Sequence, residues 1–172
     1  MQIISSTFSF KNRLVYFAIG VLAFLIAYSV GASIQLTQEE ADEITRQFEE
    51  QVAGIGAEGL SSNNIVIALG MFLPGFGAGL GAYTAASTGM LFTALATSYD
   101  LQDVSPLAVL ATPFGILEVL AYGLAMSRSG MLVYQVVKRR PWREYAIPTA
   151  IEIAIVVVML LVAGAVEAEY IQ

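Results

Sequence analysis

Long apolar stretches alternate with short polar segments along this chain. The apolar stretches cover residues 14–34, 65–98, 107–127 and 147–165. A helix of about 20 apolar residues spans the hydrocarbon core of a bilayer. The pattern therefore predicts helices that cross a membrane, with no separate soluble domain.

The first apolar stretch, residues 14–34, contains no charged residue. A signal peptide cleaved near Val30-Gly31-Ala32 is one alternative for it. However, this apolar run is longer than the ~7–15 residues of a usual signal-peptide core. We expect a retained membrane helix.

The second apolar stretch is long enough for two short helices, with a break at Pro74-Gly75. Small residues then recur at every fourth position, at Gly77, Gly81, Ala85, Gly89, Thr93 and Thr97. Such a series lets membrane helices approach one another closely. We expect one helix over 60–74 and a second over 77–98. A re-entrant loop without a net crossing is the alternative.

A polar segment over residues 37–52 has the pattern of a short amphipathic helix. Thr37 and Glu40 have the spacing of a capping box. An apolar stripe consists of Ala41, Ile44, Phe48 and Val52, and acidic residues occupy the other faces. This acidic helix serves either as a docking site for a partner or as a solvated cover.

The basic residues predict the orientation of the chain, because they collect on the cytoplasmic flanks of membrane helices. Seven of the eight flank the first span or lie between the last two: Lys11, Arg13, Arg128, Lys138, Arg139, Arg140 and Arg143. They share one side only if residues 65–98 cross the membrane an even number of times. This places the N-terminus in the cytoplasm and the acidic helix and the C-terminus outside.

The predicted fold is therefore an all-α, polytopic transmembrane bundle that forms a single membrane domain over residues 1–172. It has about five membrane helices and one short extracytoplasmic amphipathic helix. The expected spans are 14–34, 60–74, 77–98, 107–127 and 147–165, and the amphipathic helix covers 37–52.

Composition supports this class and narrows the chemistry. Hydrophobic residues make up 57% of the chain and charged residues 13%, against about 45–50% and about 25% in soluble domains. There is no cysteine and no histidine, which removes the usual zinc ligands, thiol nucleophiles and histidine bases. The net charge of −6 argues against nucleic acid as a partner. We expect no cofactor, metal or catalytic set.

Two acidic residues fall inside predicted spans. A charge at a helix centre is costly, so Glu118 should face the bundle and have a partner. It is either a proton or ion site or a neutral acid that joins two helices by a hydrogen bond. Glu152 lies about one turn into the last span, where it can reach water or Arg143, and we expect a structural role.

Two further motifs allow more than one interpretation. Asn63 and Asn64 open the second span, either as part of a helix cap or as amides that bond a neighbouring helix. The glycine-rich run from Gly75 to Gly81 lacks the spacing and the preceding strand of a dinucleotide site. A helix break with tight packing explains it, although broken helices also form substrate sites in transporters.

Several of these segments, in order, carry a resemblance to a known family. The matching residues are Asn63-Asn64, the glycines of Gly77–Gly81, Thr88-Gly89 where relatives have Asn-Gly, and Pro113-Phe114-Gly115-Ile116-Leu117-Glu118. The last resembles a Pro-His-Gly-x-x-Glu motif of the stage II sporulation protein M family, with Phe114 in place of histidine. The resemblance covers about residues 63–130. It implies a small helical membrane protein that acts through partners, as does the family's named member, a membrane scaffold that works with cell-wall hydrolases during engulfment.

The leading functional hypothesis is a non-enzymatic membrane scaffold or accessory subunit whose partners are other membrane proteins or further copies of itself. The alternative is a subunit of a small transporter or channel that uses Glu118 near a Pro/Gly helix break. An intramembrane enzyme is the weakest class, because the histidine of rhomboid-type and zinc proteases and the G-x-G-D signature of aspartyl proteases are absent.

Overall fold

The computed structural model describes residues 10–54, 57–101 and 103–171. Within these ranges the regular structure is entirely helical, which confirms the all-α prediction. The α-helices are α1 (Phe10–Ala32), α2 (Gln38–Val52), α3 (Ala57–Gly70), α4 (Gly77–Ser98), α5 (Pro113–Val137) and α6 (Trp142–Ile171), and a short 3₁₀ helix, η1 (Ala108–Ala111), precedes α5.

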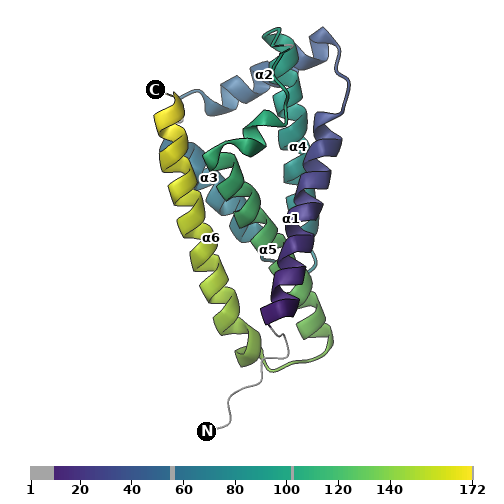
Figure 1. Cartoon of the computed structure of the whole chain (residues 1–172), viewed down its shortest axis with the longest axis vertical. Helices are drawn as coiled ribbons and strands as arrows, with labels where there is room; N and C mark the ends of the chain where they lie inside the picture. The colour runs from purple at the N-terminus through teal and green to yellow at the C-terminus, as the bar shows by residue number, and fades with distance from the viewer. Residues whose placement is uncertain (1–9, 55–56, 102, 172) are drawn as a thin grey trace.

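Helix α5 is the central element of the bundle. It packs along α1 and α6 and also contacts α4 and η1, whereas α3 packs mainly on α6. Figure 1 shows α2 lying across one end of the bundle, where α1 and α4 finish and where the chain ends. The start of α1 and the turn between α5 and α6 lie at the opposite end.

Local sequence explains where two of these helices begin. Thr37 caps α2, its hydroxyl accepts a hydrogen bond from the backbone N–H of Glu40, and the Glu40 side chain bonds back to Thr37. This confirms the predicted capping box. Thr112 caps α5 in a similar way, and Pro113 occupies the first turn, where its missing N–H costs nothing.

The helix bounds differ from most of the expected spans: α1 covers 10–32 instead of 14–34, α3 covers 57–70 instead of 60–74, and α6 covers 142–171 instead of 147–165. For α5, residues 107–111 are apolar, but they form η1 and a turn, so the helix begins at Pro113 instead of at residue 107. Because the apolar run Met131–Val137 continues α5 without a break, this helix also extends ten residues past Ser127.

Glycines allow α1 to pack directly on the backbone of its neighbours. A methyl group at Gly31 would collide with the carbonyl oxygen of Ala86 on α4. A methyl group at Gly20 would collide with the carbonyl oxygen of Gly123 on α5. Close approach of this kind is a main source of helix association in membranes, where lipid tails are as apolar as the side chains.

Three of the described helices, α1, α5 and α6, are long and apolar enough to cross a membrane by length and composition. Helix α3 is shorter, with 14 residues. The outward faces of α1 and α6 carry large exposed apolar side chains, among them Leu14, Ile19, Ile26, Ile147, Ile151 and Val158. These surfaces identify a multi-pass membrane protein, since water would be a poor solvent for them.

Candidate functional site

Glu118 lies on α5 in the half of the bundle nearer α2, and α3 supplies its partner. The amide nitrogen of Asn64 donates a hydrogen bond to Oε1 of Glu118 at 2.8 Å. Tyr122, one helical turn further along α5, is buried, and Glu167 of α6 lies close enough to interact electrostatically with both. The structure therefore brings α3, α5 and α6 together around one carboxyl group.

The two asparagines at the start of the second span have different surroundings. Asn64 is half-buried and bonds Glu118, whereas Asn63 is exposed. Nearby, Ser61 is buried against Gly164 of α6, where a methyl group would collide with the serine hydroxyl. Of the two predicted amides, only Asn64 reaches the predicted carboxyl.

Pro113 and Gly115 shape the entry into α5 and do not contact the Glu118 carboxyl through any hydrogen bond in the described residues. The Gly115 backbone N–H donates to the Thr112 hydroxyl at 3.0 Å. A side chain at Gly115 would collide with the carbonyl oxygen of Val109. This glycine lets η1 fold back onto the first turn of the helix.

The small residues of α4 contact several different elements. A methyl group at Gly77 would meet the carbonyl oxygen of Met71, and one at Gly81 would meet the side chain of Met126 on α5. A methyl group at Gly89 would meet the carbonyl oxygen of Tyr28 on α1. Close packing explains these glycines without a ligand-binding site.

Glu152 has different partners from those expected. Its carboxylate accepts from Nε and Nη2 of Arg13 at 2.6 and 2.8 Å and from Nε of Arg128 at 2.7 Å, and Nη2 of Arg128 also donates to it. The expectation that it reaches water or Arg143 is wrong, because its side chain is only 12% exposed and faces α1 and α5. We call Arg13, Glu152 and Arg128 the charge triad.

The charge triad joins α1 to α5 and α6, and Arg13 lies 139 residues before Glu152 in the sequence. Arg13 also donates to the hydroxyl of Ser127 at 2.9 Å and to the carbonyl oxygen of Leu124 at 3.4 Å. The side chain of Arg128 is 4% exposed. Removing one member of such a buried ion pair strongly destabilises a protein, because the other charge is left buried without compensation.

Arg13 and Arg128 were assigned from the sequence only as topological flanks. A signal for Arg128 did exist, because apolar residues continue on both sides of Ser127-Arg128-Ser129. An arginine inside a continuing apolar helix needs a partner. No comparable local signal in the sequence indicates that Arg13 also binds Glu152.

The acidic helix α2 lies on the end of α4. Ser98 donates to Asp42 at 2.7 Å and accepts from Thr45 at 3.2 Å, and the Tyr99 hydroxyl bonds Glu49. These contacts fix one face of α2, on which Ala41 is also buried.

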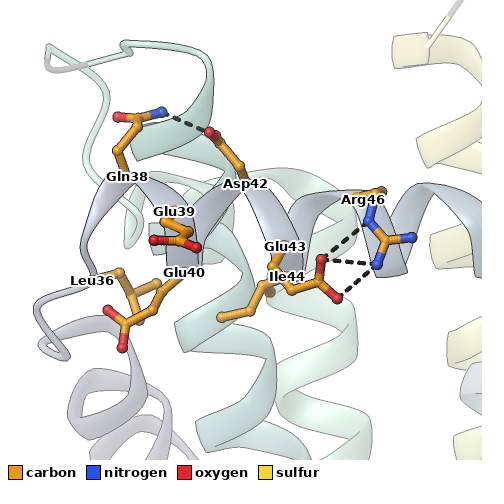
Figure 2. Close-up of a pocket in the computed structure, with 8 residues that line it drawn as sticks. All are labelled: Leu36, Gln38, Glu39, Glu40, Asp42, Glu43, Ile44 and Arg46. Atoms are coloured by element: carbon orange, nitrogen blue, oxygen red, sulfur yellow. Dashed lines mark hydrogen bonds and ion pairs between the residues drawn. The ribbon is translucent and has the colours of Figure 1, made fainter.

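The other faces of α2 are polar and border an open hollow of about 1000 Å³. Figure 2 shows this hollow, with the half-buried side chains of Leu36 and Ile44 among polar neighbours and with Arg46 bonded to Glu43. The hydrogen bonds from Arg46 and Gln47 lower the pKa of the Glu43 carboxyl below its usual range.

A bundle of apolar helices, joined internally by close glycine contacts and buried polar bonds, defines a multi-pass helical membrane protein. Comparison with known families gives a more specific result. The model described as "Stage II sporulation protein M" matches residues 13–170, so the chain belongs to the stage II sporulation protein M family. No curated protein matches the sequence, and no solved structure does.

Proposed function

We propose that this protein is a non-enzymatic scaffold or accessory subunit of a membrane complex. The observation that carries the proposal is the use of the buried polar side chains. Asn64 bonds Glu118, the charge triad joins α1, α5 and α6, Ser129 donates to the Leu73 carbonyl, and Thr93 donates to that of Ala32. Each of these contacts joins one segment of the bundle to another.

The proposal includes five crossings with the N-terminus in the cytoplasm. The charge triad and the exposed residues Lys138 and Arg143 lie at the end where α1 starts, and acidic α2 lies at the opposite end. This separation of charge agrees with the preference of basic residues for the cytoplasmic side. Helices α3 and α4 run between the same two ends and would supply the second and third crossings.

Two surfaces would serve a scaffold. The exposed apolar faces of α1 and α6 can pack against lipid or against helices of another protein. Outside the bilayer, α2 presents a fixed acidic surface, because one of its faces is bonded to α4. A partner could therefore contact the protein both within the membrane and beyond it.

The test is gentle purification of the tagged full chain from its native membrane after crosslinking. We expect a second membrane protein in a stoichiometric complex, and we expect the amount of that protein to fall when the gene for this chain is deleted. A monodisperse monomer whose deletion leaves every neighbouring complex intact would contradict the scaffold role.

One observation favours a second candidate, a transporter or channel subunit. Two carboxyl groups, Glu118 and Glu167, lie near one another between α5 and α6. If this site moves ions, Glu118→Gln should abolish flux in proteoliposomes without changing the thermal unfolding midpoint. Absence of flux in the unaltered protein, or equal flux in the variant, would remove this candidate.

A further inference from the structure

The charge triad contains more positive than negative charge. Two guanidinium groups, those of Arg13 and Arg128, share the single carboxylate of Glu152. The cluster therefore keeps one positive charge. The exposed fraction of the side chain is 17% for Arg13, 4% for Arg128 and 12% for Glu152. A charge withdrawn from water in this way is unfavourable unless a counter-ion reaches it.

Other acids do not supply that counter-ion within the described residues. Glu144, in the first turn of α6, is exposed and forms no ion pair there. The other exposed charged residues at this end are basic and would attract a further anion: Lys11, Lys138, Arg139, Arg140 and Arg143. The local field therefore favours an anion from outside the chain.

The guanidinium of Arg128 still has donors to offer. A guanidinium carries five N–H groups in a planar fork. Arg128 uses Nε and Nη2 on Glu152, and Nη1 has no acceptor among the residues that the structure describes. By contrast, all three nitrogens of Arg13 are engaged, with Glu152, Ser127 and the carbonyl oxygen of Leu124.

The Nη1 group of Arg128 is not completely enclosed by the described residues. In the described part of the chain, the enclosed side-chain atom that lacks a hydrogen-bond partner is Oε1 of Gln135. Nη1 of Arg128 is not enclosed in that way. A buried planar guanidinium that has two N–H groups without an acceptor suits the oxygens of a phosphate group.

We propose that the charge triad is a binding site for a phosphate oxyanion, supplied by the headgroup of an anionic phospholipid or by free phosphate. Arg128 would bind the oxyanion through Nη1, and Glu152 and Arg13 would hold Arg128 in place. Basic pockets between helices near the membrane surface bind such headgroups. The site is independent of whether the protein acts as a scaffold.

The experiment measures the thermal unfolding midpoint of the full chain in neutral detergent. Phosphatidylglycerol, inorganic phosphate and, as a zwitterionic comparison, phosphatidylcholine are titrated separately. We expect phosphatidylglycerol to raise the midpoint in a saturable way. A response to phosphatidylglycerol alone assigns the lipid as the source, and an equal response to inorganic phosphate assigns the free anion.

Variants separate the site from general surface charge. Glu152→Gln removes the competing negative charge but keeps an amide oxygen that can accept a hydrogen bond from Arg128 and hold it in place. The half-saturating concentration should therefore fall by about tenfold, which corresponds to about 1.4 kcal/mol. Arg143→Gln removes one exposed charge from the same end and should leave the half-saturating concentration unchanged. A purely structural ion pair predicts a less stable Glu152→Gln protein with no gain in anion affinity.

Arg128→Lys provides a second measurement if Glu152→Gln does not fold, because it keeps the charge and removes the free N–H edge. We expect the anion response to be lost in this variant. The proposal is overturned if neither anion stabilises the unaltered protein. It is also overturned if Arg143→Gln alters the response as much as the triad variants do.

Discussion

Gly89 and Gly79 belong to the same helix, α4, but have different surroundings. A methyl group at Gly89 would collide with the carbonyl oxygen of Tyr28, whereas nothing lies within 4 Å of one at Gly79. We expect Gly89→Ala to destabilise the protein by about 1–3 kcal/mol through overpacking. Gly79→Ala should be neutral or stabilising by up to ~1 kcal/mol, since alanine is the better helix former.

Thermal unfolding of the two purified variants checks this prediction. Both changes add one methyl group to a glycine of the same helix, so intrinsic helix propensity affects them alike. Equal midpoints for the two variants would show that α1 does not approach α4 closely at Gly89.

Asn64 and Asn63 offer a second matched pair. Asn64→Ala removes the donor to Glu118, and interhelical polar bonds in membranes contribute about 0.6 kcal/mol on average and up to about 1.7 kcal/mol. We expect a loss of stability in this range. Asn63→Ala alters an exposed side chain and should change the unfolding free energy by less than about 0.5 kcal/mol. A loss that is equal in the two variants would contradict the bond to Glu118.

At the residue scale, the sequence predicted which polar side chains need a hydrogen-bond or ion-pair partner. It was less successful in predicting which residue that partner is. Glu118 and Asn64 stood out because polar groups are rare in apolar spans, and the structure joins them. The partners of Glu152 were missed, since Arg13 lies 139 residues away along the chain. The packing of both α1 and α6 on α5 brings the two together.

Among the elements, α2 is the one whose stability should respond to acid. The backbone and hydroxyl of Thr37 lower the pKa of Glu40, and hydrogen bonds from Arg46 and Gln47 lower that of Glu43. A lowered folded-state pKa adds stability above the ordinary value of 4.5, and that stability is lost as the pH falls through the folded-state pKa.

We therefore expect α2 to lose order selectively on acidification from about pH 6 to about pH 3, a range that spans ordinary carboxyl pKa values. Backbone chemical shifts from nuclear magnetic resonance in micelles measure this, with α4 as the internal comparison. A variant with both Glu40→Gln and Glu43→Gln should show a much smaller change. Retention of the α2 shifts at the lower pH would refute the prediction.

The bounds of individual elements were predictable where packing and local signals agree. The small-residue series indicated a helix over 77–98, and α4 has those bounds. The start of α5 was not predictable from apolarity, because residues 107–111 are apolar but lie between Pro106 and Pro113. Proline disfavours helix in the residue before it, so a 3₁₀ turn forms there.

For the whole molecule, the proposed orientation predicts which residues face the cytoplasm. The natural chain has no cysteine, so single cysteines can be introduced at exposed positions of each end, at Glu39 and at Arg140. A membrane-impermeant maleimide added to intact cells should label the first and not the second. After the cells are opened, both should be labelled. Labelling of both positions in intact cells, or of neither, would contradict an odd number of crossings between them.

The overall class of the molecule followed from composition and pattern, because an apolar surface of this extent has no alternative to lipid. Composition and pattern did not predict which helices pack on one another. Helix α3 packs mainly on α6 and only sparsely on its sequence neighbour α4, and this interface includes the close contact between Ser61 and Gly164. A single serine and a single glycine are too common to reveal such a pairing.

The charge triad also constrains how the chain is made. Arg13 belongs to α1 and Arg128 to α5, but the carboxylate between them belongs to α6. Until α6 is inserted, the two guanidinium groups would therefore lack the Glu152 carboxylate. Because a buried charge that loses its partner is strongly destabilising, we expect a chain truncated after Val137 to be degraded faster than the full chain, which a pulse-chase measurement checks.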